Sequence, residues 1–267
     1  MVDPTLALST VLAALIVSAV CFLALWLLSL RTKDPSFVDS WWALGVVVLA
    51  WATYTQIVSP GPHATALTLL ASAWGLRLGI YLLWRWRAHG VDRRYAKLAE
   101  RARAKHGLNF AAFALLWVFL PQMFLQLIVA LPVIVPQVSD KAELGALAYV
   151  GLWVAIAGIL YEAIADAQLA HFKSQSENQG KVMSRGLWRY SRHPNYFGDT
   201  VAWWGMWLIA LDGGAGLWTL PGLLLLTYLL TRVSGAPTTE PHLQRTKPEY
   251  EAYKRRTSAF IPLPPKA

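Results

Sequence analysis

Polar residues that could bind a ligand gather in the stretch "RHPNYFGD", which begins at Arg192 and runs into an apolar segment. Pro194 can begin a helix, which places His193 near the cap and Asn195 in the first turn. A helix N-terminus with basic side chains around it attracts phosphate. Asn195 and Asp199 are four residues apart and can line one wall that binds hydroxyl or carboxamide groups. The residues expected at this site are Arg192, His193, Asn195, Tyr196 and Asp199.

The segment before this stretch carries acids and then bases. Glu162 and Asp166 are four residues apart and should share one face of a helix. A polar loop follows, and its cations are Lys173, Lys181, Arg185 and Arg189. These cations could surround a bound phosphate, or the outer ones could only grip lipid headgroups.

The segment after the last apolar run adds two more candidates, Glu240 and His242, which we expect to face the same site. The sequence "PEYEAYKRRTSAFIP" then predicts a short helix that contains Tyr250 and Tyr253. Its basic end is typical of an amphipathic helix that rests on a membrane surface.

The composition indicates that lipid is part of this chain's solvent. Of its 267 residues 56% are hydrophobic and 15% are charged, with a mean hydropathy of +0.40, whereas soluble domains carry about 25% charged residues. The net charge of +9 could suit nucleic acid, but the basic residues lie between apolar runs, which favours anionic headgroups. The single cysteine, Cys21, excludes an intrachain disulfide, and no Cys/His cluster has metal-ligand spacing.

A polytopic, all-α membrane bundle of about seven helices must position these residues, since about 20 apolar residues cross the hydrocarbon. The predicted spans are 6–30, 41–58, 65–86, 110–135, 144–165, 196–211 and 217–231. The first lacks a positive n-region and is too long for a signal peptide, so we expect it to be retained.

The basic residues predict the orientation of this bundle. All but two of the 24 Lys and Arg residues lie after the first, third and fifth spans or in the C-terminal tail. The exceptions are Lys141 and Arg77. The positive-inside rule therefore places the N-terminus outside and the C-terminus in the cytoplasm, with the polar stretches 87–109, 166–195 and 232–258 on the cytoplasmic side.

A family resemblance extends over nearly the whole chain. The motif "SRGLWRYSRHPNYFGD", followed after a helical hairpin by "YEAYKRRTSAFIP", resembles the steroid 5-alpha-reductase C-terminal family. "SFVDSWWALG" and "WGLRLGIYLLWRWRAHGVDRRY" are similar to its bacterial, DUF1295-type branch. The superfamily includes sterol C=C reductases, which use NADPH, and isoprenylcysteine carboxyl methyltransferases, which use S-adenosylmethionine. The resemblance implies a membrane bundle with a cofactor cavity that faces the cytoplasm.

The resemblance also implies roles for single residues. The family's acid at the end of the fifth span corresponds to Asp166, and its next two basic positions correspond to Lys173 and Lys181. Its Asn four residues before an acid corresponds to Asn195 with Asp199. Its His upstream of the terminal Tyr-to-Ile-Pro segment corresponds to His242. In that family these positions hold the nicotinamide, ribose and phosphate parts of NADPH.

Reduction of a C=C bond conjugated to a carbonyl needs a donor that stabilises the enolate oxygen. The candidates are Asp39, Arg77 and Tyr81. Arg77 inside a span costs at least about 2.5–3.5 kcal/mol unless it is paired, for example with Asp39, or faces a polar cavity; it could also snorkel to the interface. Asp92, Arg93 and Arg94 could close over the cofactor or form a plain charged loop. Gln122 and Gln126 share a helix face and could touch substrate or bond a neighbouring helix.

The sequence thus predicts one integral membrane domain over 1–267. Its four N-terminal helices, 1–135, form the substrate side, and 144–267 form the cofactor-binding half. We expect a multi-pass protein of the bacterial cytoplasmic membrane that uses NADPH to reduce an activated C=C bond of a hydrophobic, steroid-like or isoprenoid substrate. The expected partners are this substrate and membrane lipids, not nucleic acid. The alternatives are an S-adenosylmethionine-dependent methyltransferase of the same superfamily and a non-enzymatic lipid-binding protein.

Overall fold

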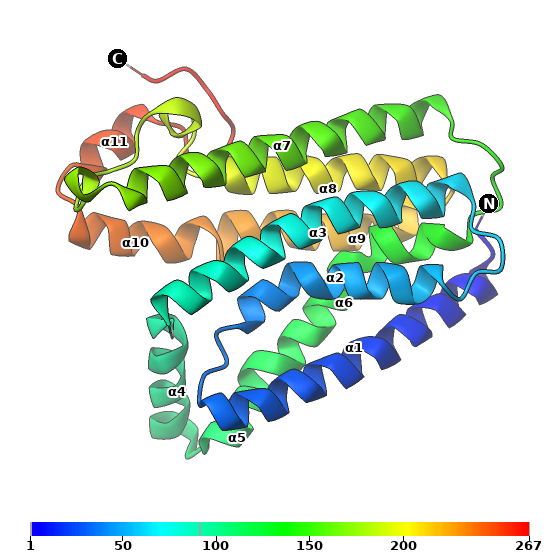
Figure 1. Cartoon of the computed structure of the whole chain (residues 1–267), viewed down its shortest axis with the longest axis horizontal. Helices are drawn as coiled ribbons and strands as arrows, with labels where there is room; N and C mark the ends of the chain where they lie inside the picture. The colour runs from blue at the N-terminus through cyan, green and yellow to red at the C-terminus, as the bar shows by residue number, and fades with distance from the viewer. Residues whose placement is uncertain (1, 91, 267) are drawn as a thin grey trace. The chain divides into compact units, whose positions relative to one another are not determined.

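The protein is an all-α polytopic membrane protein, as the sequence predicts. A computed structural model describes residues 2–90 and 92–266, and every regular element among them is helical (Figure 1). Five helical segments are long and apolar enough to cross a membrane: Pro4–Thr32, Pro62–Ala88, Phe110–Val138, Ala146–Ser174 and Gly216–Thr246.

The helices follow one another with short connections. The first part of the chain forms α1 (Pro4–Thr32), α2 (Val38–Tyr54), α3 (Pro62–His89), α4 (Arg93–His106), α5 (Phe110–Phe113), the π-helical turn η1 (Ala114–Phe119), α6 (Leu120–Ile134) and the 3-10 turn η2 (Val135–Val138). The rest forms α7 (Ala146–Ser174), the 3-10 turns η3 (Ser176–Asn178) and η4 (Gly186–Arg189), α8 (Pro194–Asp212), α9 (Gly216–Tyr228), the π-helical turn η5 (Leu229–Val233), α10 (Ala236–Thr246) and α11 (Tyr250–Arg256).

Each of the seven predicted apolar segments overlaps a helix, although the segment 41–58 extends beyond the end of α2 at Tyr54. The second, α2, has only 17 residues and is shorter than the five long segments. The fourth carries two prolines, and the helix accommodates Pro121 by beginning α6 just after the π-helical turn η1. The number of membrane crossings and the orientation with the N-terminus outside stay predictions.

The described residues form two compact units. Among the residues described, one consists of 2–90 and 92–148 with Ile209–Gly222, and the other of Tyr149–Leu208 with 223–266. The second stretch of the first unit is the hairpin that joins α8 to α9. The predicted division at 135 and 144 into a substrate side and a cofactor-binding half stays a prediction.

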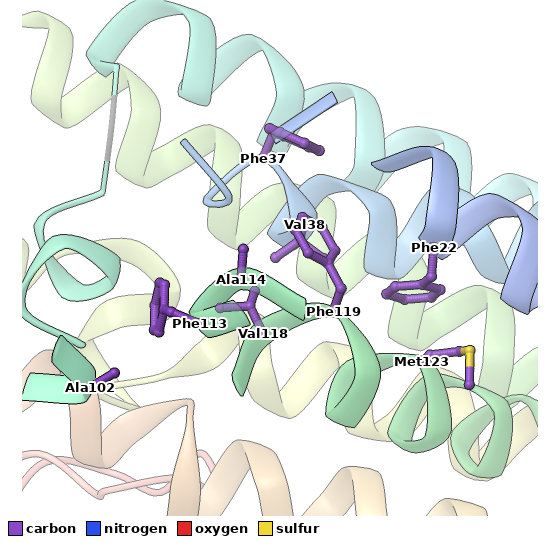
Figure 2. Close-up of a cluster of buried hydrophobic side chains, with 9 residues drawn as sticks. All are labelled: Phe22, Phe37, Val38, Ala102, Phe113, Ala114, Val118, Phe119 and Met123. Carbon is purple, nitrogen blue, oxygen red and sulfur yellow. The ribbon is translucent and has the colours of Figure 1, made fainter. Parts of the chain in front are cut away.

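The first unit has an apolar core that extends to α4, a helix within the stretch 87–109, for which the sequence predicted only a polar segment. Figure 2 shows this core. Phe22 belongs to α1, Phe37 directly precedes α2, and Ala102 belongs to α4. Tyr95, Leu98 and Ala99 pack against it. The other members are Val38, Phe113, Ala114, Val118, Phe119 and Met123. The core therefore fixes α4 onto the membrane helices.

The second unit depends on a close approach of α7 and α8. A side chain at Gly158 would overlap the backbone nitrogen of Ala202, and one at Gly205 would overlap that of Ala155. Small residues at such positions let two helix backbones pack closely in a membrane. This contact holds the acidic face of α7 against the start of α8.

Candidate functional site

The candidate site in the second unit is built at the start of α8. The helix begins at Pro194, as predicted, and the residues before it pair with the C-terminal segment. The Arg192 N–H donates to the carbonyl of Ser258 over 2.9 Å, and the Ser191 hydroxyl donates to that of Phe260 over 2.7 Å. Two chain segments that are distant in sequence therefore enclose the first turn of α8.

Arg192 and His193 meet on one carboxylate. Glu240 Oε1 lies 2.8 Å from Arg192 Nε and 3.0 Å from His193 Nε2, and the exposed fractions of these side chains are 15%, 10% and 5%. Arg192 Nη1 also donates to the carbonyl oxygens of Lys254 and Thr257, over 3.2 and 2.8 Å. Arg192 is thus engaged in joining α10, α11 and the start of α8.

The His193 ring is held from a second side. It stacks on the ring of Tyr196, with centroids 5.4 Å apart and planes 7° from parallel. Together with the bond to Glu240, this stack fixes the orientation of the imidazole.

Asn195 joins α8 to the acidic face of α7. Its Nδ2 donates to Asp166 Oδ1 over 3.1 Å, and Asp166, Glu162 and Asp199 are buried. The predicted sharing of one helix face by Glu162 and Asp166 therefore fits the structure. The Asn195 Oδ1 atom is also buried, and among the described residues it has no hydrogen-bond partner. A buried carbonyl oxygen left unpaired costs about 1–3 kcal/mol, so this atom needs a donor from outside the chain.

The predicted outer cations and His242 lie at the surface of the protein. Lys173 lies in the last turn of α7 and Arg189 ends η4, and both side chains are exposed. Lys181 is exposed, and its carbonyl accepts a hydrogen bond from the Lys247 ammonium. His242 is exposed on α10, one turn from the end of that helix. The structure thus joins Arg192, His193, Tyr196 and Glu240 in one group and Asn195 with Asp166 in another. The side chains of Lys173, Lys181, Arg189 and His242 are exposed.

The C-terminal helix α11 packs against the protein through its tyrosines, although the sequence favoured a helix that rests on the membrane. Tyr250 and Tyr253 are buried, and the Tyr253 hydroxyl donates to the carbonyls of Trp188, over 2.5 Å, and Ser191, over 3.2 Å. Burial, together with the neighbouring Tyr250, raises the pKa of Tyr253 above its ordinary value. Sequence reasoning missed these contacts because only the fold brings α11 to η4.

The first unit contains a second polar cluster, centred on Asp39. Its Oδ1 accepts a hydrogen bond from the Tyr95 hydroxyl over 2.6 Å, and its Oδ2 one from Arg94 Nη2 over 2.9 Å. Gln122 Nε2 donates to the Tyr95 hydroxyl over 3.5 Å and its Oε1 accepts from Trp42 Nε1 over 2.5 Å. The sequence suggested Arg77 as one partner for Asp39, and it allowed Arg94 either to close over the cofactor or to lie in a charged loop. In the structure Arg94 lies in α4 and bonds Asp39.

Residues of α4 influence the protonation of this cluster. Partial burial opposes ionisation of Asp92, but hydrogen bonds from Arg94 bring the pKa of Asp92 below its ordinary value. Burial and the carboxylate of Asp39 raise the pKa of Tyr95 well above its ordinary value, so its hydroxyl remains a donor at neutral pH. The Arg94 guanidinium thus lies between the carboxyl groups of Asp39 and Asp92, and the neutral Tyr95 hydroxyl donates to Asp39.

The other predicted donors, Arg77 and Tyr81, lie half-buried on α3. The Tyr81 ring stacks with that of Trp84, with centroids 6.2 Å apart, and the Arg85 guanidinium lies 6.0 Å from its centre. Gln126 donates to the carbonyls of Trp41 and Trp42, over 3.1 and 3.0 Å, which is the helix-bonding alternative that the sequence allowed.

His63, near the start of α3, is buried in the first unit. Its Nε2 lies 2.8 Å from Asp212 Oδ2, an oxygen that also accepts the Gly145 N–H over 3.0 Å. Asp212 is the last residue of α8 and lies far from α3 in the sequence, so no local pattern linked the two.

Comparison with known proteins identifies a family and no individual relative. The family model described as "Protein of unknown function (DUF1295)" matches residues 25–257. No curated protein and no solved structure matches the chain.

Proposed function

The chain belongs to the DUF1295 family of proteins of unknown function, and we propose that it is an NADPH-dependent membrane oxidoreductase. The reaction would be the reduction of an activated C=C bond of a hydrophobic substrate, steroid-like or isoprenoid, in the bacterial cytoplasmic membrane. The proposal extends the family to the steroid 5-alpha-reductase superfamily, on the resemblance described above. The observation that carries it is the buried, unpartnered Oδ1 of Asn195 beside Asp166.

The residues at the start of α8 fit a nicotinamide dinucleotide. The Asn195 Oδ1 atom can accept a hydrogen bond from a carboxamide or hydroxyl group, both of which this cofactor carries. Asp166 and Asp199 are buried acids that suit hydroxyl groups, and Lys173, Lys181 and Arg189 are exposed cations that suit phosphates. Buried acids and exposed cations suit a ligand whose carboxamide and ribose hydroxyls lie apart from its phosphates.

The protein's own residues would bind the cofactor and orient it and the substrate. Arg192, bonded to Glu240, would hold the C-terminal segment over the start of α8, and His193 would present a fixed ring edge. The cofactor, when bound, supplies the hydride. In the first unit Asp39, Arg77 and Tyr81 are the predicted groups that stabilise the enolate oxygen, and the lipid-embedded helices keep water from the substrate.

A ligand titration tests the proposal. Purified protein in lipid nanodiscs is titrated with NADPH and, separately, with S-adenosylmethionine, and binding is followed by calorimetry. We expect NADPH binding in the wild type and an affinity about three- to tenfold lower in Asn195→Ala, the loss that one neutral hydrogen bond brings. Gln56→Ala, which removes an exposed amide after α2, is the matched control and should bind as the wild type does.

The two alternatives give different outcomes in the same experiment. Binding of S-adenosylmethionine but not NADPH, sensitive to Asn195→Ala, would identify a methyltransferase. Absence of binding of either cofactor to a folded wild-type protein would favour the non-enzymatic lipid-binding alternative and refute the reductase.

A further inference from the structure

Helix α4 has two chemically distinct faces. Tyr95, Leu98, Ala99 and Ala102 follow the i, i+3, i+4, i+7 spacing of one helix face and pack on the apolar core of the first unit. Exposed cations, Lys97, Arg101 and Lys105, lie outside this face. Figure 1 shows α4 turned across the direction of α3, at the end where α1 and α3 finish. This is the arrangement of a helix that lies along a membrane surface.

A hollow of about 490 Å³ lies where α4 meets α5. Its apolar lining comes from Ala99, Leu108, Phe110 and Phe113, and its polar lining from Glu100, Arg103 and Asn109. Asn109 is already used, because its side chain caps α5 by accepting the Ala112 N–H over 2.9 Å. In the part of the chain that the structure describes, the side chains of Glu100 and Arg103 have no hydrogen-bond or ion-pair partner. The hollow therefore offers one carboxylate and one guanidinium above an aromatic floor.

Two contacts next to this hollow are of a kind that occurs at the level of lipid headgroups. The Lys33 ammonium, at the end of α1, lies 5.7 Å from the centre of the Phe110 ring. His106, at the end of α4, has its ring centroid 5.3 Å from that of Trp117, a tryptophan that is 42% exposed. Tryptophan and lysine side chains of this kind concentrate at the membrane–water interface.

We propose that this hollow binds a phospholipid with a phosphoethanolamine headgroup. Arg103, with Lys33 nearby, would bind the phosphate, and Glu100 would accept hydrogen bonds from the primary ammonium. The glycerol and the first methylenes would contact Phe110 and Phe113. A purely anionic headgroup has no positive group that could pair with the Glu100 carboxylate. A choline headgroup is positively charged but has no N–H to donate to it. This site does not depend on the reductase activity proposed above.

The test is lipid retention in native mass spectrometry. The whole protein is exchanged into an equimolar mixture of phosphatidylethanolamine, phosphatidylcholine and phosphatidylglycerol of the same chains, and the lipids that stay bound are counted. We expect the wild type to retain phosphatidylethanolamine over phosphatidylcholine by about fivefold, the scale of one exposed ion pair. Glu100→Gln should abolish that preference, and Arg103→Gln should reduce retention of all three lipids.

A second cation of α4, outside the hollow, provides the control. Arg101→Gln removes a cation that does not line the hollow, so the preference should stay unchanged. All three substitutions are at exposed positions, and unchanged melting temperatures would show that the bundle is intact. Preferential retention of phosphatidylglycerol, equal retention of the three lipids, or an undiminished preference in Glu100→Gln would each overturn the proposal.

Discussion

The Tyr95 hydroxyl donates a hydrogen bond to Asp39 Oδ1 over 2.6 Å and so joins α4 to the start of α2. Arg94 reaches the other oxygen of the same carboxylate. Two consecutive residues of α4 therefore hold one acid, and the core contacts of Leu98 and Ala102 follow along the same helix. The position of α4 depends on both the polar and the apolar contacts.

Replacing Tyr95 by Phe should loosen α4 without unfolding the membrane helices. The change removes one hydrogen bond to a charged, partly buried carboxylate, a loss of about 1.5–3 kcal/mol. Hydrogen exchange measured by mass spectrometry should show faster exchange over 93–106 and little change over 4–32. Tyr149→Phe, at a 54% exposed position, is the control and should leave both segments as they are. Equal protection of α4 in the wild type and in Tyr95→Phe would show that packing alone holds this helix.

Replacing Glu240 by Gln should release the C-terminal segment. Arg192 and His193 both lose their shared carboxylate, and the pairing of Arg192 with the carbonyls of Lys254 and Thr257 becomes weaker as a result. Limited proteolysis should cut 247–266 faster by about tenfold or more, the factor for a loss of roughly 1.5–3 kcal/mol. Glu251→Gln, on the exposed side of α11, should be cut at the wild-type rate.

Replacing Gly158 by Val should separate α7 from α8. A side chain at this position overlaps the backbone of Ala202, which a rotamer change cannot relieve. Overpacking of this kind costs about 1–3 kcal/mol or more, so the melting temperature in detergent should fall by several degrees. Gly61→Ala is the control, since its new methyl group would meet Lys141 O at an ordinary 3.6 Å. An unchanged melting temperature for Gly158→Val would contradict the close helix contact.

The buried tyrosines of α11 predict a loss of stability at high pH. Burial raises the pKa of Tyr253, and burial with Glu240 nearby raises that of Tyr250, above the value of about 10 for an unfolded tyrosine. Below about pH 10 both tyrosines keep their protons in the folded and in the unfolded protein, so their contribution to the unfolding free energy is fully present. Above it the unfolded state loses the proton first, so each tyrosine lowers the unfolding free energy by up to about 1.4 kcal/mol per pH unit until the folded pKa is reached.

Melting temperatures at pH 8 and pH 11 check this prediction. Tyr253→Phe should be less stable than the wild type at pH 8, because the bond to Trp188 is lost. Its further decrease towards pH 11 should be smaller, because one ionisable group is gone. A wild type and a variant with the same alkaline decrease would show that Tyr253 ionises freely in the folded protein.

Replacing Lys173 by Ala should weaken binding of NADPH by about tenfold to a hundredfold, the range for one charge-assisted hydrogen bond. Its side chain is exposed at the end of α7, so the fold should be unaffected. Lys266→Ala, another exposed lysine, should bind as the wild type does. Unchanged affinity in Lys173→Ala would remove this residue from the proposed phosphate site.

Local patterns in the sequence were sufficient to predict the apolar helices and some of the local geometry at the start of α8. Apolar length alone located the apolar helices, and Pro194 marked the start of α8 because a first turn tolerates a missing N–H. The spacing of Glu162 and Asp166 placed both acids on one face of α7. Each of these predictions uses information that lies within a few residues of the feature.

The remaining contacts join residues that are far apart in sequence. Arg192 meets Glu240, and His63 meets Asp212, through packing that no periodicity in the chain encodes. Helix α4 did have a readable signal in the spacing of Tyr95, Leu98, Ala99 and Ala102, but the many charges between them favoured a loop.

The family match ends at residue 257, yet the acceptors for Arg192 N–H and Ser191 Oγ are Ser258 and Phe260. A protein truncated at that boundary would lose both acceptors, so the residues just before α8 would no longer pair with the C-terminal segment. A reporter fused directly after residue 257 would have the same effect. Deletion studies and tag placement should therefore leave the last ten residues in place and use the amino end of the polypeptide instead.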